Sequence, residues 1–293
     1  RRTPPSAKRA EGAPAGKVQS RPVSVLRFSK YQGLGNDFLV VGPDDGVDAA
    51  LAERLCDRHR GVGADGVLVV DPAAPSMKVI NADGSVPEMC GNGLRCVVWH
   101  LAREGRWTGD ADLGTGAGPH RARLHAEGDV EIWMRPPTLV PAEIPCGAPL
   151  IAAPVSVGDT ELTLTAVGMG NPHAVTFDEL DVAARLRLGP QVQAHPLFPA
   201  GVNVGFAHFE QGALILHVLE RGAGWTQACG TGACAAAVAA VETGRAERGA
   251  PIQVVLPGGP LTIVVGAPGE PVRMRGPARH VFDGTVDLSR LPE

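Results

Sequence analysis

The chain has 293 residues, of which 44% are apolar and 20% charged, the balance of an ordinary globular protein. A chain of this length tends to form two packed domains rather than a single core. Its net charge is −4, but residues 1–22 carry +5 and the remainder therefore −9, which argues against a nucleic-acid partner for the folded part.

Residues 1–22 mix basic residues with proline and hold almost no large apolar side chain, a composition that predicts a flexible basic tail. This segment lacks the apolar core of a secretory signal, and no apolar stretch approaches the roughly 18 residues of a membrane span. We therefore expect a cytoplasmic protein without a membrane partner. Disulfide frameworks belong to small secreted chains, so free thiols are expected at all six cysteines: Cys56, Cys90, Cys96, Cys146, Cys229 and Cys234.

Short apolar runs between turn residues predict buried strands at 38–41 and 67–70, and helical spacing over 47–59 predicts a helix between them. A second helix is predicted over 94–104, ending at Gly105. Strands are expected at 213–219, 252–256 and 261–265, where β-branched residues alternate or cluster. The alanine-rich run 233–240 predicts a small-faced helix that ends at Gly244 and is buried close to its neighbours.

The phrase Cys-Gly-x-Gly occurs twice, at 90–93 and 229–232, and each copy opens into a predicted helix. A Gly-x-Gly-Asn phrase ends 54 positions before the first cysteine and 58 before the second. An internal repeat of this kind predicts two similar domains with a site at their interface. We expect an N-terminal domain over 23–136, completed by 278–290, and a C-terminal domain over 137–277.

A thiol at a helix start is expected to be reactive, because first-turn amides and the helix dipole favour thiolate over thiol. The glycines after Cys90 and Cys229 let a ligand approach those amides. Two such thiols indicate a two-sided proton-transfer site. His173, on a turn within the repeat, is a candidate for support in acid–base chemistry. Glu220-Arg221, ahead of a glycine-rich turn, is a further candidate pair, although two adjacent opposite charges can also form a plain surface ion pair.

Two other motifs do not predict the binding sites that they resemble. The phrase at 61–66 matches the dinucleotide fingerprint, but it follows a helical pattern and precedes a strand, the reverse of the order that binds pyrophosphate. The cysteine pairs lack the two-residue gap of structural zinc hairpins, so no metal is expected.

Taken together, the phrases of this chain closely resemble those of diaminopimelate epimerases, from about Arg27 to the C-terminus. The phrases that carry the resemblance are Gly33-Leu34-Gly35-Asn36-Asp37-Phe38, Asn81-Ala82-Asp83-Gly84-Ser85, Cys90-Gly91-Asn92-Gly93-Leu94-Arg95-Cys96, Gly170-Asn171-Pro172-His173, Glu220-Arg221-Gly222-Ala223-Gly224, Ala228-Cys229-Gly230-Thr231-Gly232 and Gly276-Pro277-Ala278 with Val281-Phe282-Asp283-Gly284.

The resemblance implies an α/β protein of the α+β type with two similar pseudo-symmetric domains. Each would be a mixed, mostly antiparallel sheet wrapped around a central helix, with the active site in the interdomain cleft. It also implies a homodimer that needs no cofactor and interconverts LL- and meso-diaminopimelate for lysine and peptidoglycan precursors. Thiolate and thiol would exchange the α-proton on opposite faces of the carbon, with sulfurs roughly 6–7 Å apart.

By the same resemblance the catalytic residues are Cys90, Cys229, His173 and Glu220. The implied substrate-binding residues are Asn36, Asn81, Gly91, Asn92, Asn171, Asn203, Glu220, Arg221, Gly230 and Thr231. A carboxylate fits the fork of Arg221, and Glu220 can accept from an ammonium group.

Two positions depart from the family pattern: many members have glutamine at Gly66 and glutamate at Trp225, so the roles of those side chains do not carry over. Three alternatives stay open. A proline or hydroxyproline racemase would use the same thiols but usually has histidine at Asn92, and a phenazine-type isomerase would lack the cysteine pair. A non-enzymatic binding protein on the same scaffold is the third.

Overall fold

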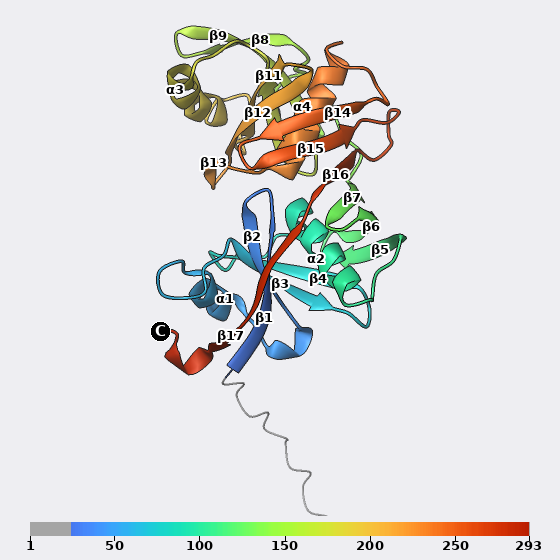
Figure 1. Cartoon of the computed structure of the whole chain (residues 1–293). Coiled ribbons are helices and arrows are strands. Elements are labelled where there is room, and N and C mark those ends of the chain that lie inside the picture. The colour runs from blue at the N-terminus through green and yellow to red at the C-terminus, as the bar shows by residue number, and fades with distance from the viewer. Residues whose placement is uncertain (1–24, 293) are drawn as a thin grey trace, which may run out of the picture.

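The structure is a computed structural model that describes residues 25–292, so the predicted tail at 1–22 lies outside the described residues. It is a two-domain α+β fold of mixed sheet with few helices, drawn in Figure 1. The first half contains β1 (Val25–Gly33), β2 (Asn36–Val41), η1 (Pro43–Asp45), α1 (Ala49–Cys56), β3 (Gly66–Asp71), β4 (Ser76–Asn81), α2 (Gly91–Arg103), β5 (Asp110–Thr115), β6 (Gly118–Ala126) and β7 (Asp129–Trp133).

The second half begins after β7 and ends on a strand that returns to the first half. Its elements are η2 (Pro141–Glu143), β8 (Ala153–Val157), β9 (Thr160–Gly168), β10 (Pro172–Thr176), α3 (Val182–Gln193), β11 (Asn203–Glu210), β12 (Ala213–Glu220), β13 (Gly224–Thr226), α4 (Gly230–Glu242), β14 (Pro251–Leu256), β15 (Gly259–Val264), β16 (Arg273–Pro277), β17 (Arg279–Asp287) and η3 (Leu288–Arg290). No helix in the described part of the chain is long and apolar enough to span a bilayer.

The two halves share one order of strand pairings. In the first half β1–β2 is antiparallel, β2–β3 parallel, β3–β4 antiparallel, β4–β5 parallel, and β5–β6 and β6–β7 antiparallel. The strands β9, β10, β11, β12, β14, β15 and β16 repeat this order. Each parallel pair needs a crossover, which α1 and α2 supply in one half and α3 and α4 in the other. The predicted internal repeat is thus confirmed.

Helices α2 and α4 are the central helices around which the strands pack. Helix α2 packs against β1, β2, β3, β4, β6, β7 and β17, and α4 packs against β9, β10, β11, β12, β14 and β15. Residues 232–240 of α4 are all buried, which confirms the small-faced helix expected there. Alanine side chains let the surrounding strands approach the helix axis closely.

Helix α1 is shorter than the predicted 47–59. Asp48 caps its start by accepting from Leu51 N. At its end the Asp57 side chain accepts from the amides of His59 and Arg60 at 2.8 and 2.9 Å, a local turn that competes with the helix. The buried residues of α1 are Ala52, Leu55 and Cys56.

The last strands tie the two halves together, as the red strand in Figure 1 shows. Strand β16 pairs with β15 and with β7, and β17 then pairs with β1 from Val25 to Gln32. The predicted domain bounds, 23–136 with 278–290 for one domain and 137–277 for the other, stay predictions.

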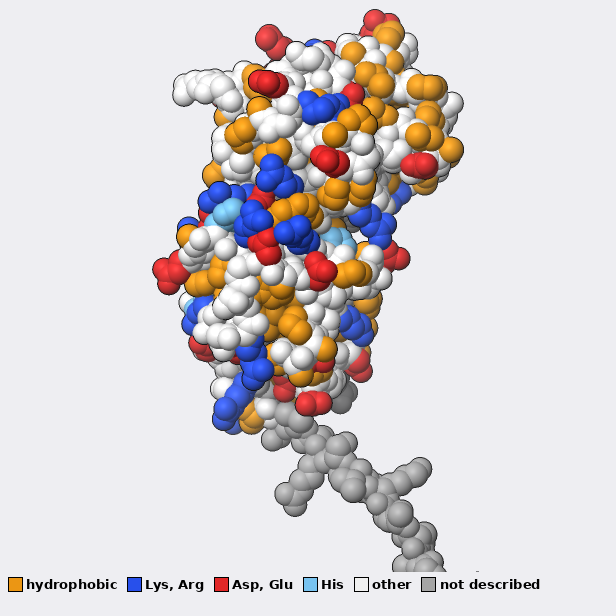
Figure 2. All heavy atoms as spheres, turned by 90° about the vertical axis from the view of Figure 1, so that its right-hand side faces the viewer, with side chains coloured by type: hydrophobic (Ala, Val, Ile, Leu, Met, Phe, Trp, Pro, Cys, Tyr) orange, Lys and Arg blue, Asp and Glu red, His pale blue; other side chains and the backbone are white. Residues whose placement is uncertain are grey.

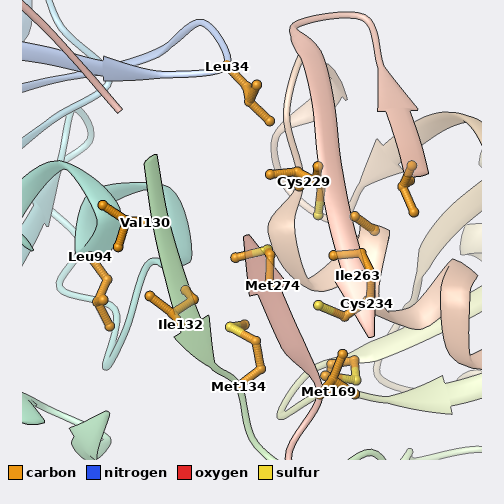
Figure 3. Packing of buried hydrophobic residues seen from close by; sticks show 14 of the residues in the cluster. Leu34, Leu94, Val130, Ile132, Met134, Met169, Cys229, Cys234, Ile263 and Met274 are labelled. Atoms are coloured by element: carbon orange, nitrogen blue, oxygen red, sulfur yellow. The ribbon is translucent and has the colours of Figure 1, made fainter. Parts of the chain in front are cut away.

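A turn of the first half packs directly on the second half. Leu34, between β1 and β2, is 4% exposed and belongs to one apolar cluster with Met274, Cys229 and α4. Figure 3 shows its side chain directed toward Cys229. At Gly258, before β15, a Cβ atom would lie 1.9 Å from the Leu34 carbonyl oxygen. Only glycine allows the two backbones to approach this closely.

Replacing Gly258 with alanine should therefore loosen the contact between the halves. We expect Gly258→Ala to lower the free energy of unfolding by about 1–3 kcal/mol, the usual cost of overpacking, read as a lower thermal midpoint. Gly42→Ala is the matched control, because its Cβ would meet only the flexible Asp45 carboxylate, at 3.3 Å. Equal midpoints for both variants would contradict this account.

Candidate active site

Cys90 and Cys229 occupy the same structural position in the two halves. Each is the N-cap of a central helix, with extended backbone, and its sulfur accepts from the amide three residues on. The Sγ atoms lie 3.5 Å from Gly93 N and 3.3 Å from Gly232 N. The first-turn amides of both helices therefore point toward the sulfurs.

The starts of α2 and α4 lie close together and pack against the same side chain, Met274 of β16. A Cβ built on Gly91 would lie 2.9 Å from Met274 Cε, and one on Gly230 would lie 3.1 Å from the same atom. The sum of these two distances puts the two built positions at most 6.0 Å apart. Figure 3 shows Met274 between Cys229 on one side and Ile132 of β7 and the following Met134 on the other. The topology thus brings the two cysteine phrases together.

Asn36 and Asn92 form the polar surroundings of Cys90. Asn36 Oδ1 accepts from Asn92 Nδ2 at 3.2 Å and lies 3.9 Å from Cys90 Sγ. The Asn36 amide nitrogen in turn donates to Asp65 Oδ2 at 2.8 Å. The turn that carries Asn36 is thereby fixed against the start of α2.

A chain of hydrogen bonds leads to Cys229. His173 Nε2 lies 2.9 Å from Asn171 Oδ1, Asn171 Nδ2 donates to Thr231 Oγ1 at 3.3 Å, and Thr231 Oγ1 lies 3.7 Å from Cys229 Sγ. The Asn171 oxygen requires a donor, so the tautomer with a proton on Nε2 fits this chain. The predicted residues His173, Asn171 and Thr231 therefore form one network beside the second thiol.

The remaining predicted polar residues bond outside these two networks. Glu220 accepts from Thr226 Oγ1 at 2.5 Å. The buried Asn203 is used by backbone groups, donating to Pro172 O and accepting from Arg221 N. Arg221 extends along the surface and donates to Ala200 O at 2.6 Å.

Asn81 also lies outside the two thiol networks. Its amide donates to Ser85 Oγ at 2.9 Å. It pairs with Gly66, where a Cβ atom would lie 2.7 Å from Ile80 O. Gly66, one of the two departures from the family pattern, thus has no room for a side chain. At the other departure, Trp225 packs its ring on that of Phe206.

The pKa values of the two thiols are shifted against the expectation that the helix starts favour thiolate. Burial raises the pKa of Cys90, although the amides of Gly93 and Asn92 and the charge of Arg95 oppose this. Burial raises the pKa of Cys229 well above its ordinary value, and the Glu220 carboxylate raises it further. The first-turn amides act in the predicted direction, but removal from water outweighs them, so thiol rather than thiolate is favoured at both positions.

His173 is neutral at ordinary pH, because burial lowers its pKa to about 3. A neutral imidazole can orient Asn171, but it supplies no imidazolium proton near neutral pH. Its role in the network is therefore that of a fixed hydrogen-bonding group.

Two contributors to the site were not singled out from the sequence. Met274 packs against both helix starts, and no sequence signal marks it. Arg95, fully buried in α2, donates to Asn92 Oδ1 at 2.8 Å. A basic residue among the apolar residues of a predicted helix was the signal that could have identified it.

The sequence matches the profile of the diaminopimelate epimerase family over residues 28–140 and 165–281. Diaminopimelate epimerases of Cyanothece sp. and Stutzerimonas stutzeri are both 44% identical, over 89% and 90% of this chain and 99% and 100% of theirs. A Bacillus anthracis phenazine biosynthesis protein of the PhzF family has the same fold, with a TM-score of 0.68 and 14% identity over 90% of this chain and 99% of that one. A hydroxyproline epimerase from Agrobacterium vitis superposes with a TM-score of 0.62 and 17% identity, over 91% and 92%.

The buried His173 should make stability depend on pH. The unfolded chain binds a proton near pH 6.5 and the folded chain only near pH 3, so the free energy of unfolding falls as pH falls through this window. Between pH 7 and pH 5 the native protein should lose about 2 kcal/mol more than His173→Gln. Denaturant unfolding of both at the two pH values measures this; equal losses would show that His173 is not buried as a neutral group.

Proposed function

Because the chain belongs to the diaminopimelate epimerase family, we propose that it inverts one α-carbon of diaminopimelate, with Cys90 and Cys229 as the two acid–base groups. The observation that carries this proposal is that two cysteine-capped helix starts, one from each half, converge on the same Met274 methyl group. Inversion requires groups on opposite faces of a carbon, and in this proposal Cys90 and Cys229 are those groups.

In the proposed reaction one sulfur, as thiolate, removes the α-proton, and the other, as thiol, delivers its proton to the opposite face. The C–H bond broken and the C–H bond formed involve the same carbon, so the substrate gains or loses no electrons. Afterwards the first sulfur is a thiol and the second a thiolate, and the roles are exchanged for the reverse direction. By family resemblance Cys90 would act on the LL centre and Cys229 on the meso centre.

The first-turn amides of both helices are proposed to stabilise the charge that develops beside the α-carboxylate. The N–H groups around Gly91-Asn92 and Gly230-Thr231 belong to helix starts, where they have no partner within the helix. Fixed donors in a water-poor site stabilise a developing negative charge without reorganising. This would let the reaction proceed without a cofactor to delocalise the carbanion. The cleft between the two halves is the proposed place of the substrate.

The distal end of the substrate carries an ammonium and a carboxylate group. Arg221 is proposed to bind that carboxylate, because its exposed guanidinium has donors beyond the one used by Ala200 O. Glu220, which lies close enough to raise the pKa of Cys229, is proposed to accept from an ammonium group. Asn36, Asn81, Asn171 and Asn203 are proposed to position the substrate or the residues that contact it.

The function is tested by hydrogen exchange. LL-diaminopimelate incubated with the protein in heavy water should gain one α-deuterium as the meso isomer forms, followed by NMR and chiral chromatography. Cys90→Ala and Cys229→Ala should each lower kcat/KM by at least about a hundredfold. Cys146→Ala, a buried free cysteine of a different apolar cluster, should keep full activity. Exchange into proline but not diaminopimelate would instead favour a racemase.

We propose that the protein is a cytoplasmic homodimer. All six cysteines are free, as a reducing compartment requires. Strand β17 pairs with β1 and exposes two large apolar side chains, Val281 at 53% and Phe282 at 44%. Beside it is a hollow of about 820 Å³ lined by residues such as Phe28, Tyr31 and Asp283. An edge strand with exposed apolar residues is a surface that a second copy can cover.

The dimer proposal predicts the effect of a charge on this strand. Phe282→Asp should convert the dimer to a monomer, measured by light scattering coupled to gel filtration. Leu186→Asp, at a 53% exposed position on α3, should leave the dimer intact. A native protein that elutes as a monomer would refute the proposal.

A further inference from the structure

Arg95 differs from the arginines that surround the junction of the two halves. Arg121, Arg273 and Arg275 are half-exposed and paired with Asp110, Glu131 and Asp129. Figure 2 shows basic and acidic side chains gathered together on this face, so its charges neutralise each other. Arg95 is 0% exposed, and no carboxylate among residues 25–292 forms a salt bridge with it.

The guanidinium of Arg95 bonds only to neutral oxygens in the described part of the chain. It donates to Asn92 Oδ1 at 2.8 Å, to Pro277 O at 3.3 Å and to Gly91 O at 3.5 Å. Gly33 leaves room for it, because a Cβ there would lie 3.1 Å from Nη2, and Gly276 lies alongside, where a Cβ would be 3.6 Å from Nε. The side chain thus contacts the start of α2 and the end of β16 at once.

A buried cation without an anion is costly, because neutral acceptors replace only part of its lost hydration. The titratable groups that face Arg95 are the thiols of Cys90, Cys96 and Cys234. Cys96 and Cys234 lie in the core, and burial raises the pKa of each to about 12. Cys90 alone of the three is partly exposed and stands at the proposed substrate site.

The opposite thiol has the opposite electrostatic neighbour. Glu220 lies beside Cys229 and opposes its ionisation. It also opposes the ionisation of Cys90, but less strongly than Arg95 favours it. The two halves therefore place a fixed positive charge on one side of the site and a negative charge on the other.

We propose that Arg95 is the counter-cation of ionised Cys90, so that Cys90 rather than Cys229 carries the negative charge first. Arg95 is then a positioning residue as well, because its bond to Asn92 Oδ1 directs Asn92 Nδ2 to Asn36, beside the Cys90 sulfur. This inference rests on the proposed function only in taking the two sulfurs as the acid–base pair.

The ionisation order is measured by thiolate absorbance near 240 nm as a function of pH. Cys229→Ser isolates Cys90 and Cys90→Ser isolates Cys229, each read against the double variant, which removes the contribution of the other cysteines. Cys90 should ionise at lower pH than Cys229. Arg95→Met in the Cys229→Ser background should raise the Cys90 midpoint by about one pH unit or more, and Arg95→Lys should restore most of that shift. Arg275→Met, whose guanidinium binds Asp129 on the surface, should change nothing.

Activity gives a second measurement. Arg95→Met should lower kcat/KM at neutral pH by about tenfold or more and shift the rise of activity to higher pH. Both reaction directions should fall by the same factor, because the overall equilibrium fixes their ratio. A merely structural role would lower activity without moving the pH profile, and that result would overturn the proposal.

The outcomes separate this inference from the proposed function. Ionisation of Cys229 before Cys90, or an unchanged Cys90 midpoint in Arg95→Met, would overturn the role of Arg95. If Arg95→Met does not fold, two measurements still test the role of Arg95: the Cys90 midpoint in Arg95→Lys, and the order in which Cys90 and Cys229 ionise. Both require only that the protein keeps its native arrangement. Absence of epimerisation by the native protein would overturn the function alone, since the titrations do not require turnover.

Discussion

The structure depends on two helix N-termini that lie close together inside the protein, both packed against Met274. Two positive dipole ends at this separation are electrostatically unfavourable without a negative charge beside them. Apolar packing provides the compensation: one cluster runs from Tyr31 through Met274 to α4 and joins both halves. The proposed substrate carboxylate is the anion that such a pair of helix starts favours.

The repeated topology explains why the two sides of the site are alike, and individual side chains explain why they differ. The same order of strand pairings delivers a cysteine-capped helix from each half. Asn92 stands two positions after Cys90, and Thr231 stands two positions after Cys229. Different hydrogen bonds therefore surround the two sulfurs. With Arg95 on one side and Glu220 on the other, a symmetric fold holds a polar, asymmetric site.

Sequence patterns predicted the elements that are both buried and regular. The helix over 94–104 and the strands at 38–41 and 67–70 appeared because burial leaves a continuous apolar signal. Helix α3 escaped detection, since it buries only three residues and contains Pro190. Strand β17 is mostly exposed and has no apolar alternation to detect.

The candidate site divides in the same way. Cys90 and Cys229 were predictable because repetition makes a short phrase informative. The contact of Met274 with both helix starts was not, because it depends on how distant segments pack. The direction of the thiol pKa values was predicted wrongly for a related reason: the helix start is a local feature, whereas desolvation depends on everything packed around the sulfur.

The raised pKa values of the two thiols affect how strongly each sulfur can act as a base. A thiolate in water is a weak base for an α-proton, whereas one formed in a site that raises its pKa is a stronger base. The cost is that less of the enzyme is ionised before substrate arrives. Diaminopimelate carries two ammonium groups, and their positive charge lowers the pKa of a nearby thiol on binding. If Cys90 and Cys229 act as proposed, their burial therefore makes ionisation depend on the charge of the substrate bound beside them.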